Sequence, residues 1–161
     1  MNARKAYTAY NNAVKARKRL PKLEQIIMKD AEWAYWYAKD IIKGRWLEAE
    51  PIIAHSGMFA YFYALNIIKS RWSEAEPTII QDTYWAYLYA RDVIHMRWFE
   101  AEEIIAKSDW KTVYTKCFFD EPMITKDKVG PLIWKRMNLP GYFAPARLFQ
   151  DKVSLLDMVT E

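Results

Sequence analysis

The sequence predicts an all-α protein, a short α-solenoid of two-helix repeats with an atypical N-terminal cap and an irregular C-terminal helical cap. Two segments each occur three times at a period of 26 residues: Arg-Trp-x-Glu-Ala-Glu at 45–50, 71–76 and 97–102, and Ala-Tyr-x-Tyr-Ala at 34–38, 60–64 and 86–90. A fixed period of about 20 to 50 residues is the signature of repeat architectures, in which each repeat buries its apolar face against its neighbours.

Composition supports a folded, aromatic-rich chain. Apolar residues make up 52% of the 161 residues and aromatic residues 16%, which excludes a disordered chain. The single cysteine, Cys117, excludes an internal disulfide framework and leaves the redox compartment open, with a reducing cytosol the simpler expectation. The chain has no apolar run of membrane-spanning length and no apolar segment after Met1. We therefore expect a soluble, cytoplasmic protein without a membrane partner.

Three regions are expected along the chain. Residues 1–23 are predicted to form a basic capping helix and partial repeat, because 19–24 keeps the Arg, the apolar second position and the final Glu of the repeated segment. Terminal repeats are usually atypical, since one face has no neighbour. Residues 24–118 form the repeat array. Residues 119–161, where the period is lost and prolines are frequent, form C-terminal loops and capping helices, the last over 145–159.

Each repeat is expected to contain a long helix and a short one. Good N-cap residues recur every 26 residues and open the long helix: Asp30, Ser56, Asp82 and Ser108. The long helix should end near Gly44, Ser70 and Met96. The short helix follows the tryptophan; Ser73 and Glu76 have the spacing of a capping box, and prolines at 51 and 77 fall near the start, where a missing N–H costs little.

The repeated charges are interpreted as structural. An active site needs one arrangement, whereas an arginine recurs three times with an acid three residues later, which predicts the same local ion pair or cap in Arg45–Glu48, Arg71–Glu74 and Arg97–Glu100. Trp46, Trp72 and Trp98 are similarly expected to pack between repeats.

No catalytic residue, metal ligand or cofactor is expected. His55 and His95, the only histidines, occupy different positions of the repeat, so they give no metal-binding or catalytic spacing. The sequence contains no glycine-rich phosphate loop, nucleophile elbow or His-Glu-x-x-His pattern. We therefore expect a protein that is not an enzyme.

Positions that vary between repeats are the candidates for binding another protein. One set of equivalent positions, Trp36, Phe62 and Leu88, is either inter-repeat core or a recognition surface. Two further sets would form a mainly basic stripe if exposed, suited to a partner with an acidic surface. The stripe comprises Lys39, Leu65 and Arg91, then Lys43, Lys69 and His95, beside the aromatic Tyr35, Tyr61 and Tyr87.

Nucleic-acid binding through the N-terminal segment is the alternative. Residues 1–23 carry seven basic side chains and no acid, with a cluster at Lys15, Arg17, Lys18 and Arg19. Such a cluster can neutralise phosphates. It can equally be a solvated face of the capping helix, or a patch for an acidic protein.

The segments Arg45–Ile53 and Ala60–Ala64 resemble a family of short tandem helical repeats found in bacteriophage and some bacterial proteins. The resemblance implies two helices per repeat and a phage origin, and it brings no catalytic residues. It leads us to expect a non-enzymatic protein-binding module that inhibits a host protein, such as a defence protein, in the host cytoplasm.

Overall fold

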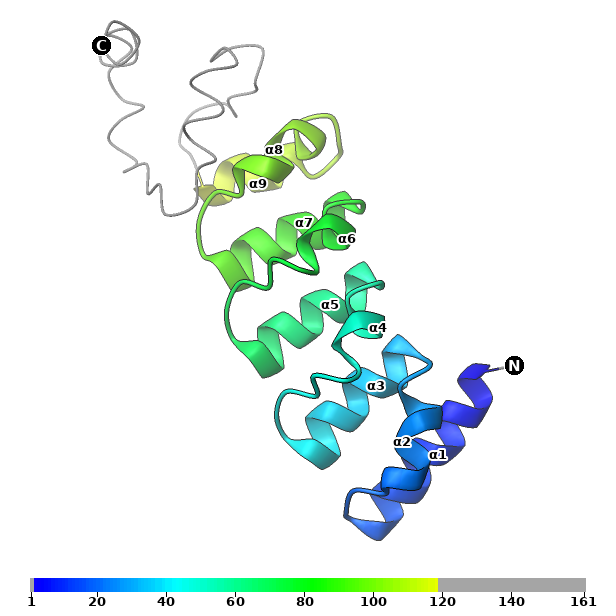
Figure 1. Cartoon of the computed structure of the whole chain (residues 1–161). Coiled ribbons are helices and arrows are strands. Elements are labelled where there is room, and N and C mark those ends of the chain that lie inside the picture. Colours follow the sequence, from blue (N-terminus) through cyan, green and yellow to red (C-terminus); the bar gives the residue numbers. More distant parts are fainter. Residues whose placement is uncertain (1, 119–161) are drawn as a thin grey trace, which may run out of the picture. The chain divides into compact units, whose positions relative to one another are not determined.

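The computed structural model describes residues 2–118, and every regular element in that range is a helix (Figure 1). The prediction of an all-α chain is therefore confirmed for this range. The chain divides into two compact units, residues 1–97 and residues 98–161. The predicted C-terminal region, 119–161 with its helix over 145–159, lies outside the described residues.

The first unit contains long and short helices in alternation. The long ones are α1 (Asn2–Ala16), α3 (Ala31–Tyr37), α5 (Gly57–Tyr63) and α7 (Thr83–Tyr89). The last three continue into π-helical turns η1 (Ala38–Ile42), η2 (Ala64–Ile68) and η3 (Ala90–Ile94). The short ones are α2 (Pro21–Ile27), α4 (Glu50–Ile53) and α6 (Glu76–Ile79). The second unit begins with α8 (Phe99–Ile105) and α9 (Lys111–Phe118).

The long helices of the first unit pack in chain order. Helix α1 contacts α3, α3 contacts α5, and α5 contacts α7, while each short helix lies against its neighbouring long helices (Figure 1). The π-helical turns follow the same order, η1 beside η2 and η2 beside η3. The 26-residue sequence period therefore corresponds to one step from a long helix to the next.

The helix ends agree with the predicted caps at some positions only. The carboxylates of Asp30 and Asp82 accept backbone N–H bonds from the first turns of α3 and α7. Ser56 is the N-cap residue of α5 as predicted, but its hydroxyl accepts no backbone N–H bond from the first turn. The predicted capping box was wrong, because Ser73 donates to Glu74 and the Glu76 carboxylate is bound elsewhere.

The long helices end in π-helical turns at residues 42, 68 and 94, close to the predicted ends. In η1 and η2 the backbone N–H of residue 43 or 69 donates to a carbonyl five residues back, at Ala38 (2.7 Å) and Ala64 (2.6 Å). A π-helical turn accommodates one more residue than an α-helical turn over the same length. Helix α1 has no such turn. Positions within α1 therefore match those of the later long helices at a spacing of 25 rather than 26.

The repeated tryptophans are buried, as predicted. Trp46 and Trp72 are 2% and 4% exposed, and their rings contact Tyr37 and Tyr63 at centroid distances of 5.0 and 5.2 Å. The two indoles have the same surroundings because each follows the same loop and meets the equivalent tyrosine.

Substitution of Trp72 by Ala should lower the free energy of unfolding by about 3–5 kcal/mol, because it removes a buried indole and leaves a cavity. Urea denaturation followed by circular dichroism measures the change. Leu47→Ala is the control, since that side chain is 63% exposed and its loss should change stability by less than about 0.5 kcal/mol. Equal effects of the two substitutions would contradict the buried role of Trp72.

Candidate binding surface

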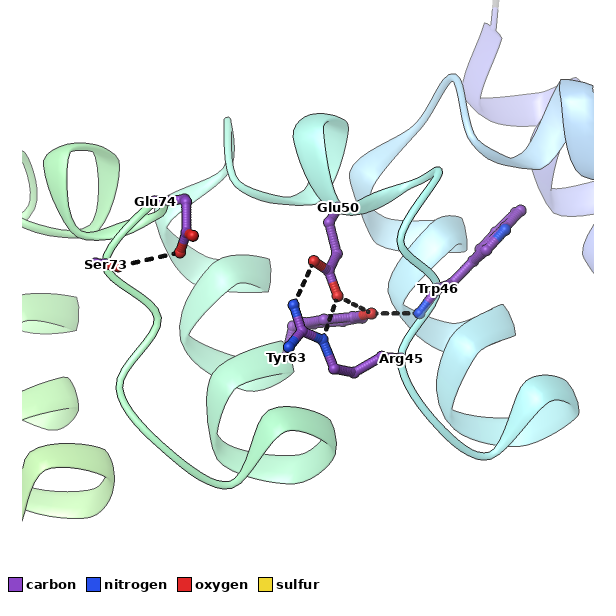
Figure 2. Close-up of polar contacts among 6 residues, drawn as sticks. All are labelled: Arg45, Trp46, Glu50, Tyr63, Ser73 and Glu74. Atoms are coloured by element: carbon purple, nitrogen blue, oxygen red, sulfur yellow. Dashed lines mark hydrogen bonds and ion pairs between the residues drawn. The ribbon is translucent and has the colours of Figure 1, made fainter.

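The same polar cluster joins successive repeats in the first unit (Figure 2). Two guanidinium nitrogens of Arg45 donate to the two carboxylate oxygens of Glu50, both at 2.8 Å. The hydroxyl of Tyr63, on the next long helix, donates to Glu50 at 3.1 Å and accepts the backbone N–H of Trp46 at 2.6 Å. One carboxylate thus ties the loop after one long helix to the helix that follows.

The cluster recurs on both sides of this junction. The earlier copy contains Arg19, Leu20, Glu24 and Tyr37, and the later copy contains Arg71, Trp72, Glu76 and Tyr89. Within the second unit, the Tyr114 hydroxyl likewise accepts the N–H of Trp98 and donates to Glu102, which is fully buried. Residues 19–24 therefore keep the polar cluster of the later repeats, although they lack the tryptophan.

For Arg45 and Arg71 the ion-pair prediction was right in kind and wrong in partner. Arg45 and Arg71 bind Glu50 and Glu76, five residues on, rather than Glu48 and Glu74. Glu50 and Glu76 start the short helices, where their carboxylates reach both the arginine and the tyrosine hydroxyl, whereas Glu48 and Glu74 are exposed. These arginine and glutamate side chains therefore hold the repeats together.

The cluster also shifts the pKa values of its members. The bidentate bond from Arg19 lowers the pKa of the Glu24 carboxyl below its usual range, and Tyr37 adds a second hydrogen bond. Burial raises the pKa values of the Tyr63 and Tyr89 hydroxyls well above the ordinary value of 10.0. Both effects favour the charge states that the cluster needs at neutral pH, an ionised carboxylate and a neutral phenol.

A second set of hydrogen bonds links consecutive long helices directly. Tyr10 donates to Asp40 at 2.6 Å and Tyr61 donates to Asp92 at 2.7 Å, while Asn66 donates to the Tyr35 hydroxyl at 3.0 Å. Each acceptor or donor, Asp40, Asn66 or Asp92, lies in a π-helical turn. Each π-helical turn therefore contains a polar side chain that forms a hydrogen bond with a tyrosine of the preceding long helix.

These bonds correct one part of the predicted stripe. Tyr35, Tyr61 and Tyr87 were expected beside an exposed basic surface, but they are only 2%, 4% and 4% exposed. Their hydroxyls bind within the first unit, that of Tyr87 to Arg91 at 3.1 Å. Tyr61 also contacts the ring of Trp85 on the next long helix. The three tyrosines are interior residues, so their rings offer no surface to a partner.

The basic residues of the stripe are exposed, but not all carry an uncompensated charge. Lys39, Lys43, Lys69, Arg91 and His95 all reach solvent. The Arg91 guanidinium donates to both oxygens of Asp92, at 2.6 and 2.7 Å, and lowers the pKa of that carboxyl. The Lys39 ammonium lies 4.9 Å from the centre of the Trp36 ring. Lys43 and Lys69 have no ion-pair partner among residues 2–118.

Four exposed basic residues share an unusual backbone conformation. Arg17, Lys43, Lys69 and His95 have φ values of 52°, 61°, 59° and 58°, in the left-handed region. Each directly follows α1 or the π-helical turn that ends a later long helix, at a constant spacing of 26. Arg17 was predicted to belong to the N-terminal basic cluster and not to the stripe. Its spacing of 26 residues from Lys43 could have placed it with Lys43, Lys69 and His95.

Stability alone does not account for these four residues. The left-handed conformation costs a residue with a side chain about 1–2 kcal/mol, and glycine is the usual solution after a helix. A cation at a helix C-terminus recovers about 0.3–1 kcal/mol at an exposed position. The expected cost exceeds the expected gain, so a basic side chain at these positions calls for a reason besides folding.

The N-terminal cluster lies at the end of α1. Lys15, Arg17 and Lys18 are exposed, whereas Arg19 is committed to Glu24. A groove of about 440 Å³ runs between α1 and α2, lined by Arg4, Lys5, Thr8, Ala9, Asn12, Leu23 and Ile26. Its lining contains no acid, histidine or cysteine.

Within the described range, no cluster of three His, Cys, Asp or Glu side chains has the arrangement of a metal site. The same range holds no helix with the length and apolar character to cross a bilayer. Comparison of the chain with protein-family models, curated proteins and solved structures finds no match in any of the three. The resemblance to tandem helical repeats therefore remains a prediction.

Tyr63→Phe should lower the free energy of unfolding by about 1–3 kcal/mol, because the buried N–H of Trp46 loses its acceptor and Glu50 loses a donor. Urea denaturation measures the change. Tyr7→Phe, which removes a hydroxyl from a half-exposed ring, should stay within about 0.5 kcal/mol of the wild type. A neutral effect at Tyr63 would show that its hydroxyl does not hold the junction.

Glu24→Gln should destabilise the protein by about 1–2 kcal/mol at pH 7 and progressively less in acid. The folded-state pKa of Glu24 lies below its ordinary value of 4.5, so the ion pair contributes stability above that pH and loses it as pH falls through the folded pKa. Thermal unfolding between pH 7 and pH 3 tests this, with the exposed Glu48→Gln as control. A difference that stays constant across this range would contradict the assignment.

Proposed function

We propose that the chain is a small α-solenoid that acts as a non-enzymatic module for binding another protein. The stacked order of α1, α3, α5 and α7 supports a solenoid in the first unit. Solenoids present extended surfaces formed by the same position of successive repeats. A binding module needs such a surface, with side chains that are not already used to hold the repeats together.

The division of labour between repeated and variable residues carries the proposal. The repeated Arg, Glu and Tyr residues are bound to one another at each junction, so they support the fold and are poor candidates for chemistry. Exposed Lys39, Lys43 and Lys69 have no such role. Their charge suits a partner with an acidic surface. Stoichiometric inhibition of that partner is a role that a module of this kind can fill.

Quantitative capture from a nuclease-treated bacterial lysate tests the proposal. Immobilised full-length protein should enrich an acidic protein in a saturable manner, and enrichment should fall as salt rises because the contact is electrostatic. Lys43→Glu/Lys69→Glu should lose that protein, whereas the charge-matched Lys29→Glu/Lys107→Glu should retain it. If the wild type enriches no protein above blank resin, the proposal fails.

The N-terminal cluster supports nucleic-acid binding as the second candidate, because Lys15, Arg17 and Lys18 are exposed in a segment without acids. Gel retardation of a labelled DNA or RNA at low salt should then be lost in Lys15→Ala/Arg17→Ala/Lys18→Ala. Arg19 is left unchanged because its loss would break the ion pair with Glu24. Absence of a shift for the wild type would dispose of this candidate.

A further inference from the structure

Four basic residues that share the left-handed conformation lie along one edge of the first unit. Arg17, Lys43, Lys69 and His95 come at the C-terminal ends of the successive long helices, α1, α3 with η1, α5 with η2, and α7 with η3. These ends point the same way, toward the lower left of Figure 1. We infer that this cationic edge binds an extended acidic segment of a partner protein. The inference rests on the proposed function and names its site and the class of its partner.

Packing fixes the spacing of the cationic edge. Neighbouring long helices are in contact, and so are neighbouring π-helical turns. Packed helices lie about 8–10 Å apart, so equivalent residues at their ends repeat at about that distance. The left-handed cap residue sits at the same place in each step, which makes the row regular. An extended polypeptide in the polyproline II conformation rises about 3.1 Å per residue with three residues per turn, so acids at every third residue lie on one face about 9 Å apart and would match the row.

The sequence choice at these positions indicates function. Glycine would take up the left-handed backbone without steric cost, yet each of the four positions carries Arg, Lys or His. Lys43 and Lys69 are exposed and have no ion-pair partner in the described part of the chain. Arg17, Lys43 and Lys69 therefore place positive charge, and His95 a basic side chain, where the backbone favours a residue without a side chain.

Several features favour an acidic polypeptide over a nucleic acid. One cation about every 8–10 Å is sparse beside a nucleic-acid strand, which carries a phosphate about every 3.4 Å in a duplex. Single-stranded binding also uses exposed aromatic rings for stacking, but Tyr35, Tyr61 and Tyr87 are buried.

The test uses three labelled probes and the full-length protein. The first is an 18-residue peptide with Glu at every third position and Ser or Gly elsewhere, the second has the same composition with its Glu residues contiguous, and the third is an 18-nucleotide oligothymidine. Fluorescence anisotropy at low and moderate salt gives each dissociation constant. The variant Lys43→Gly/Lys69→Gly removes two charges from the edge, and Lys29→Ser/Lys107→Ser removes two charges elsewhere.

The spaced peptide should bind best, and its affinity should fall about tenfold in Lys43→Gly/Lys69→Gly, the effect of losing two exposed charge contacts. The control variant should bind like the wild type. The melting temperature of the glycine variant should stay the same or rise, because glycine relieves the left-handed backbone at residues 43 and 69.

Four outcomes would overturn the inference. The first two are equal affinity of the wild type and the glycine variant for the spaced peptide, and equal affinity of the wild type for the spaced and contiguous peptides. The third is tighter binding of the oligothymidine that depends on Lys43 and Lys69. The fourth is a lower melting temperature of the glycine variant, which would give the lysines a structural role. If Lys43→Glu/Lys69→Glu and Lys43→Gly/Lys69→Gly both still capture the same lysate protein, the chain binds a protein but the cationic edge is not the binding site. Failure of the wild type to capture any protein would instead overturn the proposed function.

Discussion

The hydrogen-bonded carboxylate at each repeat junction is the interaction on which the rest of the first unit depends. Glu50 joins the guanidinium of Arg45 to the hydroxyl of Tyr63, and that hydroxyl also satisfies the N–H of Trp46. A buried donor or acceptor left without a partner is costly, so all members must be present together. This requirement fixes how each loop meets the next long helix, and it explains why Arg, Glu and Tyr recur in phase along the sequence.

This arrangement separates residues that build the protein from residues that remain available to a partner. The tryptophan, the alanines and the polar cluster fill the contacts between helices, where substitution disturbs neighbouring repeats. Several side chains at the ends of the long helices, such as Lys43, Lys69 and His95, are exposed. Lys43 and Lys69 differ from both groups, because they carry large side chains at positions where the left-handed backbone favours glycine. Backbone strain and basic side chains therefore coincide at the proposed edge.

The π-helical turns link the fold to the proposed edge. They insert one residue into the long helices without a matching gain in length, bring Asp40, Asn66 and Asp92 to tyrosines of the preceding long helix, and are followed by the left-handed basic residues. Helix α1 lacks this extra residue, so Tyr10 is the equivalent of Tyr35 at a spacing of 25 residues. Its hydroxyl binds Asp40 in the following π-helical turn, as those of Tyr35 and Tyr61 bind Asn66 and Asp92. Helix α1 therefore makes the same kind of contact with α3 as the later long helices make with one another, despite its divergent sequence.

The sequence by itself determined the helical class, the repeat period, the burial of the tryptophans and the structural character of the Arg and Glu residues, because these follow from local propensity and from identity between repeats. It did not determine which acid each arginine binds, since Glu48 and Glu50 are both close in sequence and only the position of the Tyr63 hydroxyl distinguishes them. Nor could it show that Tyr35 and Tyr61 are interior while Lys43 and Lys69 are exposed in one row. The inserted π-helical residue changes which side chains share a face, and a constant spacing of 26 carries no sign of it. Packing between helices decided these points, because burial and hydrogen-bond partners depend on neighbours that are distant in the chain.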